Sequence, residues 1–197
     1  MLENDYEEYS RIVMIGDSCV GKTSLLNRLV QDSHNPNEMP TIGAVNLLYR
    51  INVGDDTVTV NIWDTAGQEK YRSLAPIYFR NSTAAVIVFD ITSFESFSNI
   101  EKWYISLLDV APSDVIVVLA GNKCDLINES QVSHEQIDGF IRERQIPYFS
   151  TSAKDGQGVY ELFAFIGKEI ISRKKKIFLG VSSLPTGKAS QNSNVCC

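Results

Sequence analysis

Hydrophobic positions along the chain follow two patterns that alternate with each other. Residues 84–89 and 115–120 are continuously apolar, which is typical of strands in a parallel sheet covered on both faces, and residues 11–15 predict a further strand. Residues 45–53 and 58–62 instead alternate apolar and polar side chains on either side of a short turn. That alternation predicts a β-hairpin with one buried face.

Segments between and after these strands place apolar residues three and four positions apart. The spacing predicts amphipathic helices at residues 22–31, 97–108, 137–141 and 159–170. Strands that alternate with helices indicate an α/β domain. We therefore expect a mostly parallel sheet with helices on both faces and one antiparallel hairpin strand.

Length and composition fit a single domain with a sizeable core. The chain has 197 residues, of which 44% are hydrophobic and 21% are charged. Its longest apolar runs have about six residues, whereas a helix that spans a bilayer needs about 18. The N-terminus is acidic and lacks the basic and apolar regions of a secretory signal, so we expect a cytosolic protein.

Charge is distributed unevenly along the chain. The net charge is −6, yet from Arg173 onward there are five basic residues and no acidic ones. An acidic body argues against nucleic-acid binding, which needs a basic face. The basic stretch fits either an anionic membrane surface or the end of a helix, where lysines complement the dipole.

The four cysteines do not form a recognisable framework. Cys19 and Cys124 are isolated, and Cys196 and Cys197 are the last two residues. Neither a disulfide pattern nor a zinc-site spacing is present, which favours reduced thiols.

Residues 16–23 have the sequence GDSCVGKT, which matches the phosphate-binding pattern G-x-x-x-x-G-K-[ST] between a predicted strand and a predicted helix. Backbone N–H groups of such a loop, together with the helix N-terminus, form a concave donor surface for phosphates. In this pattern Lys22 neutralises the β- and γ-phosphates, and the Thr23 hydroxyl ligates Mg²⁺. An ordinary glycine-containing turn is the alternative, which the strand–helix context disfavours. The predicted nucleotide-binding residues of this loop are Asp17, Ser18, Cys19, Val20, Gly21, Lys22, Thr23 and Ser24.

A second motif, Asn122, Lys123, Cys124 and Asp125, follows the apolar strand at 115–120. A carboxylate at Asp125 can accept hydrogen bonds from the N1–H and the exocyclic amine of guanine. Adenine offers neither donor in that arrangement and would leave the carboxylate unpaired. Alone, these four residues fit a plain turn; about a hundred residues after a phosphate-binding loop, they predict guanine recognition.

A third motif, residues 64–68, has the sequence DTAGQ at the end of the strand at 58–62. Asp64 is placed to hold Mg²⁺ through water, and the Gly67 N–H can reach a γ-phosphate. Gln68 can orient an attacking water without being titratable itself. The predicted catalytic residues are Gln68, Lys22 and Gly67, and the alternative is a strand that ends in an Asp-capped turn.

These motifs, in this order, resemble those of the small Ras-like GTPases and, within them, the Rab family. The resemblance covers roughly residues 9–175 and includes IWDTAGQE at 62–69, YRSL at 71–74 and the terminal Cys-Cys. The sequences TIGA at 41–44 and SLAPIY at 73–78 are most similar to the early-endosomal Rab subgroup.

The resemblance implies a P-loop NTPase fold with a six-stranded sheet. It also divides the chain into three parts: a flexible acidic N-terminus (1–8), the GTPase domain (9–176) and a flexible hypervariable tail (177–197) that ends in Cys-Cys.

The resemblance also implies roles for residues that the motifs alone do not assign. Thr41 is expected to be the switch I threonine that contacts Mg²⁺ and the γ-phosphate, which makes Thr23, Thr41 and Asp64 the predicted metal site. Residues 65–79 are expected to form switch II, and Ser152, Ala153 and Lys154 a third nucleotide-binding loop. Contacts that exist only with a γ-phosphate would order both switch segments.

The sequence departs from the family pattern in three places, of which one, Arg80-Asn81-Ser82 in place of the usual Arg-Gly-Ala, has no physical explanation. His34 replaces the aromatic residue that stacks on guanine; it either stacks more weakly or is a solvated loop residue. Asn46 replaces an aromatic residue of the effector-facing cluster, so effector choice cannot be carried over by analogy. The predicted effector surface consists of Ile42, Gly43, Asn46, Trp63 and Tyr78.

The resemblance further implies geranylgeranyl groups on Cys196 and Cys197, with an unmodified tail as the alternative. The expected partners are an exchange factor, a GTPase-activating protein, a GDP-dissociation inhibitor, an escort protein and effectors, but not nucleic acid. We expect a monomer that binds GTP or GDP with Mg²⁺ and cycles between the cytosol and the cytoplasmic side of intracellular membranes, with the subgroup pointing to the early endosome. A P-loop small-molecule kinase and a non-hydrolysing GTP-bound scaffold are the competing functions.

Overall fold

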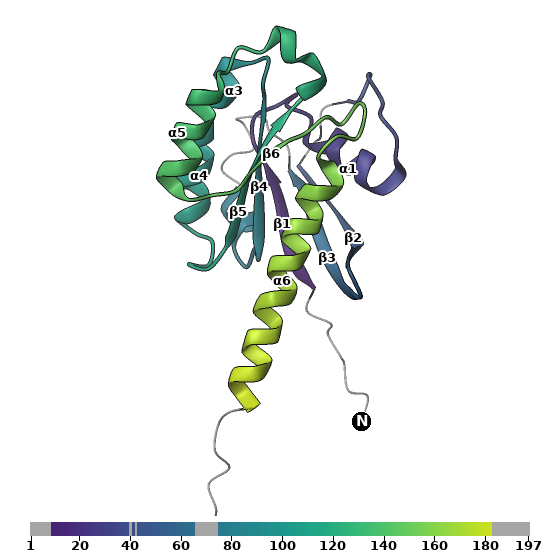
Figure 1. Cartoon of the computed structure of the whole chain (residues 1–197), viewed down its shortest axis with the longest axis vertical. Helices are drawn as coiled ribbons and strands as arrows, with labels where there is room; N and C mark the ends of the chain where they lie inside the picture. Colours follow the sequence, from purple (N-terminus) through teal and green to yellow (C-terminus); the bar gives the residue numbers. More distant parts are fainter. Residues whose placement is uncertain (1–8, 40, 42, 66–74, 183–197) are drawn as a thin grey trace, which may run out of the picture.

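The computed structural model describes residues 9–39, 41, 43–65 and 75–182. Its strands are β1 Ser10–Ile15, β2 Ala44–Val53, β3 Asp56–Thr65, β4 Ala84–Asp90, β5 Ile116–Asn122 and β6 Tyr148–Ser150. In the described residues these six strands form one sheet with the order β2-β3-β1-β4-β5-β6 (Figure 1). β2 pairs antiparallel with β3, and the other neighbouring strands pair in parallel. The predicted six-stranded sheet with one antiparallel hairpin strand is confirmed.

Helices cover both faces of this sheet, as predicted. They are α1 Lys22–Gln31, α2 Ala75–Phe79, α3 Phe94–Ser98, α4 Ile100–Leu108, α5 His134–Arg144 and α6 Val159–Ser182, with a 3₁₀ helix at Cys124–Glu129. Figure 1 shows α3, α4 and α5 together on one side of the sheet, while α6 runs along the other and continues past the strands. Among the described residues, no helix combines the length and the apolar character needed to cross a bilayer.

Two clusters of buried apolar side chains lie between the sheet and the helices on its two faces. One joins the sheet to α1 and α6 through residues such as Leu25 and Phe163, and the other joins it to α4 and α5 through Trp103 and Ile137. β1, β4 and β5 contribute to both clusters, because successive side chains of a strand point to opposite faces. Their continuous apolar sequence follows directly from this two-sided burial.

The β2–β3 hairpin is packed on one face, and its apolar alternation reflects this. Leu47, Tyr49 and Ile51 lie against the α1–α6 cluster, while their neighbours along β2 are largely exposed. A Cβ atom on Gly167 of α6 would come within 2.7 Å of the Ile51 side chain. A glycine at that position therefore lets α6 approach the hairpin closely.

Some elements differ in extent from the sequence-based expectations. The helix predicted at 97–108 is two helices, α3 and α4, that meet at Asn99, and Ser93 caps α3 by accepting from the Ser96 N–H. The helix predicted at 137–141 extends over His134–Arg144, since Ser133 and Gln136 form a capping box at its start. β6 was not located by its sequence pattern. α6 continues to Ser182, six residues into the range assigned to the tail, and residues 183–197 lie outside the described residues.

Candidate nucleotide-binding site

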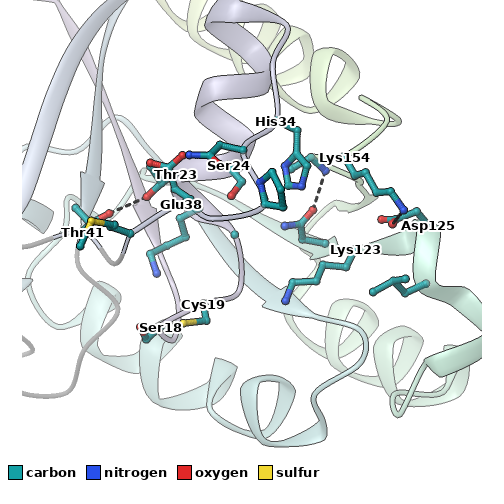
Figure 2. A pocket seen from close by; sticks show the side chains of 18 of the residues that line it. Ser18, Cys19, Thr23, Ser24, His34, Glu38, Thr41, Lys123, Asp125 and Lys154 are labelled. Carbon is teal, nitrogen blue, oxygen red and sulfur yellow. Dashed lines mark hydrogen bonds and ion pairs between the residues drawn. The ribbon is translucent and has the colours of Figure 1, made fainter.

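A pocket of about 450 Å³ lies beside the carboxyl ends of β1 and β5. Figure 2 shows Thr23 and Thr41 toward one end and Lys123 and Asp125 toward the other. We call these the P-loop end and the Asp125 end, where the P-loop is residues 16–23. The predicted site residues that line the pocket are Ser18, Cys19, Gly21, Lys22, Thr23, Ser24, His34, Thr41, Asn122, Lys123, Asp125, Ala153 and Lys154. The structure thus brings together predicted residues from four separate segments, because the carboxyl ends of parallel strands meet at one edge of the sheet.

Two glycines give the P-loop its path. Gly16 and Gly21 have φ angles of 136° and 96°, which side chains rarely adopt. A Cβ atom on Gly16 would lie 2.1 Å from the Val88 carbonyl oxygen, and one on Gly21 would lie 2.3 Å from Asn122 Nδ2. Each glycine in the motif is therefore required both by its backbone conformation and by a close neighbour.

The Lys22 side chain crosses this loop and is held by hydrogen bonds to two of its carbonyl oxygens. Its side chain is only 5% exposed, and Nζ donates to the carbonyl oxygens of Gly16, at 2.9 Å, and Asp17, at 2.7 Å. Burial lowers the pKa of Lys22 to about 8, against the opposing effect of the nearby Asp64 and Asp17 carboxylates. The loop thus presents a fixed cation on the floor of the pocket, with its aliphatic stem packed in the protein.

Two P-loop residues serve the loop's own structure with their side chains. The Asp17 carboxylate accepts from Asn99 Nδ2 at 2.8 Å and from Trp103 Nε1 at 2.7 Å, so it anchors the loop to α4 rather than lining the pocket. Val20 is part of the α1–α6 core cluster, and its carbonyl accepts from Asn122 Nδ2. Neither Asn99 nor Trp103 was singled out from the sequence, where both fit an ordinary helix pattern.

The three predicted metal ligands converge at the P-loop end. Thr23 Oγ1 donates to Asp64 Oδ2 at 2.6 Å, and the hydroxyl oxygens of Thr23 and Thr41 lie 2.7 Å apart (Figure 2). Burial raises the pKa of Asp64, although the Thr23 hydrogen bond and the Lys22 charge oppose this shift. Asp64 Oδ1 is buried and has no hydrogen-bond partner among the described residues. Hydroxyl and carboxylate oxygens with one unsatisfied acceptor fit a hard cation such as Mg²⁺.

The Asp125 end is assembled by hydrogen bonds between loops. Ser152 Oγ donates to Asp125 Oδ1 at 2.8 Å, and Lys154 Nζ lies 3.5 Å from Asp125 Oδ2. Asn122 is buried and joins two loops: its Nδ2 donates to the P-loop at Val20, and its Oδ1 accepts from the Ala153 N–H. These bonds fix the orientation of a carboxylate at the pocket wall.

Lys123 and His34 complete the lining at this end. Lys123 adopts a left-handed conformation with φ 65°, and its Nζ pairs with Asp90 Oδ2 at 2.5 Å. His34 is exposed and borders the pocket, as Figure 2 shows. Both of its predicted roles, weak stacking and a solvated loop position, are compatible with this placement.

Arg28 of α1 was missed by sequence reasoning. Its Nε donates to the Ala153 carbonyl oxygen at 2.9 Å, and its Nη2 donates to that of Lys154. From the sequence, a basic residue in the last turn of a helix is sufficiently explained by the helix dipole. No local pattern could have indicated a contact across 125 positions.

The predicted effector surface is described in part. Trp63 and Tyr78 pack with ring centroids 5.7 Å apart, and Asn46 is the exposed partner of Trp63 in the β2–β3 register. Gly43 has a left-handed φ of 76° immediately before β2. Five predicted functional residues lie outside the described residues, namely Ile42, Gly67, Gln68, Cys196 and Cys197.

Comparison with known proteins identifies the family of this chain. A model of the Ras family matches residues 11–172. The chain belongs to the Rab branch of the Ras family. It is 37% identical over 188 residues to the human Ras-related protein Rab-22A, a match that covers 95% of this chain and 97% of that protein. It is 38% identical over 194 residues to the GTP-binding protein ypt5 of Schizosaccharomyces pombe, which covers 94% and 92%.

A third relative is the Rab-22A protein of the dog, 40% identical over 162 residues, covering 82% of this chain and 84% of that protein. The predicted Rab protein of the early-endosomal subgroup is confirmed by these matches. Rab proteins are small GTPases of vesicle transport, so the chain is a GTP hydrolase of that class. This membership disfavours the small-molecule kinase and the non-hydrolysing scaffold.

Proposed function

We propose that this Rab protein binds GTP or GDP in the pocket between the P-loop end and the Asp125 end. The observation that carries the proposal is one cavity with a buried cation and a hard-oxygen cluster at one end and an oriented carboxylate at the other. Phosphates need the first set of groups, and a purine with adjacent N–H donors needs the second. Lys22 would neutralise the terminal phosphates, and Asp125 would accept from the guanine N1–H and amine.

Thr23, Thr41 and Asp64 would hold Mg²⁺ at the P-loop end. When bound, the ion supplies positive charge that neutralises the β- and γ-phosphates. The unsatisfied Asp64 Oδ1 and the two hydroxyls within hydrogen-bond distance of each other support this assignment. Cations of this kind prefer such oxygen ligands and retain several waters, so three protein groups are sufficient.

Nucleotide state would be sensed through Thr41. This residue comes from the segment that connects α1 to β2, and its hydroxyl lies 3.3 Å from Asp64 Oδ2 and 2.7 Å from the Thr23 hydroxyl. A contact from this loop to the γ-phosphate would be lost after hydrolysis, which would shift the loop's conformational equilibrium. Gln68 would orient the attacking water and the Gly67 N–H would contact the γ-phosphate, while a GTPase-activating protein would accelerate the slow intrinsic reaction.

We further propose that the tail anchors the protein on the cytoplasmic side of endosomal membranes and that the protein cycles between these membranes and the cytosol. Geranylgeranyl groups on Cys196 and Cys197 would provide the two anchors that stable attachment requires. The basic residues from Arg173 to Lys176 near the end of α6 would favour an anionic surface. An escort protein, a GDP-dissociation inhibitor, an exchange factor and effectors are the corresponding partners.

The nucleotide carried by the purified full-length protein tests this proposal. Protein purified in Mg²⁺-containing buffer is denatured, and the released small molecules are separated by chromatography. We expect guanine nucleotide at about one equivalent, and displacement of a fluorescent GDP by unlabelled GDP or GTP but not by ADP or ATP. Equal displacement by adenine nucleotides would contradict the proposal.

A further inference from the structure

Arg28 links the end of α1 to the loop that precedes α6. Its Nε and Nη2 donate to the carbonyl oxygens of Ala153 and Lys154, and its Nη1 donates to both the carbonyl oxygen and Oδ1 of Asp32, each at 2.9 Å. Asp32 has a left-handed φ of 50° and caps α1 by donating its N–H to the Arg28 carbonyl oxygen. One guanidinium thus joins Asp32, the residue that caps the end of α1, to a second loop, whose Ala153 lies 125 positions after Arg28.

The loop that Arg28 holds is the loop that orients Asp125. Ser152, directly before the Ala153 carbonyl that Arg28 binds, donates its Oγ to Asp125 Oδ1. The Ala153 N–H donates to Asn122 Oδ1, so the same short segment is fixed on both sides. A shift of this segment would move the Ser152 hydroxyl and, with it, the carboxylate that it restrains.

The contact geometry needs an arginine. The Arg28 side chain is 15% exposed, and its planar group donates in three directions to two carbonyls and to Asp32. A lysine carries its donors on a single nitrogen and cannot reproduce this fork. The Asp32 carboxylate is 92% exposed, so its ion pair with Arg28 contributes little. The hydrogen bonds to the carbonyl oxygens of Ala153 and Lys154 are therefore the contacts that position this loop.

We propose that Arg28 is a positioning residue for guanine recognition. It holds the loop of Ser152, Ala153 and Lys154 so that Asp125 keeps the orientation needed to accept from both guanine donors. The inference rests on the proposed function, because it assumes that Asp125 faces the base. It assigns to α1, whose first turn belongs to the P-loop end, a second role at the Asp125 end.

The test compares release of fluorescent GDP and IDP from the full-length protein and from Arg28→Lys. Inosine lacks the exocyclic amine, so IDP reports the recognition that depends on the second oxygen of Asp125. We expect Arg28→Lys to release GDP about tenfold faster and to reduce the preference for GDP over IDP by about threefold. A stability defect alone would not change that preference.

Two variants serve as matched controls. Asp32→Asn removes the exposed ion pair, keeps the carbonyl acceptor and tolerates the left-handed backbone, so GDP release should stay at the wild-type rate. Arg144→Lys removes an arginine that pairs with Glu101 and Glu143 on α4 and α5. It should lower the unfolding temperature and leave the GDP-over-IDP preference unchanged.

A double-mutant cycle keeps the proposal testable if Arg28→Lys is unstable. Arg28→Gln, another good helix former, is combined with Ser152→Ala, and the two changes should be less than additive in the GDP-over-IDP preference because they act on one carboxylate. Faster GDP release with an unchanged preference, or full additivity, would overturn the inference. A wild-type protein that binds ADP as tightly as GDP would instead refute the proposed function itself.

Discussion

At the P-loop end of the pocket the two charged groups are buried, Lys22 at the start of α1 and Asp64 on β3, whereas at the Asp125 end the charged group lies in the 3₁₀ helix after β5 and is oriented by side-chain contacts from another loop. Lys22 and Asp64 at the first end are about 5% and 4% exposed. Burial lowers the pKa of Lys22 and raises that of Asp64, which favours the neutral form of each group. Asp125 at the second end is held by Ser152 and Lys154 from another loop.

This difference indicates that the two ends of the pocket contribute differently to nucleotide binding. Charges fixed in a desolvated setting interact strongly with phosphates and metal, but they do not distinguish one base from another. Hydrogen-bond acceptors of defined direction discriminate between bases while adding less to the total affinity. We therefore expect the P-loop end to set how tightly a nucleotide binds and the Asp125 end to set which nucleotide binds.

The largest effect should come from Lys22→Ala. Loss of the buried cation removes charge-assisted bonds to phosphate and leaves the Gly16 and Asp17 carbonyl oxygens without their donor. We expect GDP affinity to fall by about a thousandfold, measured by equilibrium titration with fluorescent GDP.

Lys176→Ala is the matched control for this change, because that lysine is exposed near the end of α6. It should bind GDP as the wild type does. If Lys22→Ala kept its affinity and instead accepted adenine nucleotides, the assignment of the two ends would have to be exchanged.

The next effect, about a hundredfold, is expected for Asp125→Asn. An amide cannot accept from both guanine donors, so GDP affinity should fall, while XDP, whose base has a carbonyl in place of the amine, should bind better to the variant than to the wild type. Competition against fluorescent GDP measures both. Asp138→Asn, at an exposed position of α5, controls for the loss of a surface charge. Unchanged selectivity would remove Asp125 from base recognition.

Much of this architecture could be predicted from local sequence. Residues 22–31 form α1 with the predicted bounds, because apolar spacing and a glycine-defined start both mark it. The P-loop, Asp64 and Asp125 were predicted because each motif depends on a strand directly before it. Functional residues that lie at a fixed place relative to a strand or helix can therefore be predicted from the sequence.

Contacts between distant segments could not be predicted in this way. β6 has three residues, too few for any periodicity, and it was implied only by the family resemblance. The bonds from Trp103 to Asp17 and from Arg28 to Ala153 depend on how helices lie against loops. Tertiary geometry creates these partners, while the residues themselves fit an ordinary helical pattern.

Removal of Mg²⁺ should act at the P-loop end alone. With EDTA, we expect GDP release to accelerate by about tenfold, because Asp64 and the phosphates lose the cation between them. The preference for GDP over IDP should not change. Thr23→Ala should be less sensitive to EDTA than the wild type, and an altered base preference after chelation would contradict the separation of the two ends.

The smallest effect expected is the pH dependence that Lys22 imparts. Burial lowers its pKa from 10.5 to about 8, so in the free protein the ammonium loses its proton as pH rises through 8. Phosphate binding needs the charged form, and the dissociation constant for GDP should therefore rise about fourfold between pH 7 and pH 8.5. The affinity for GDP thus falls with pH, whereas the stability of the free protein should rise. Between the folded and unfolded pKa values the unfolded chain binds more protons, so the free energy of unfolding increases with pH. Titration calorimetry and thermal unfolding at both pH values measure the two trends.

A constant affinity across this range would mean that the protein keeps Lys22 charged. The affinity contributed by the P-loop end would then come from geometry and metal rather than from a titrating cation.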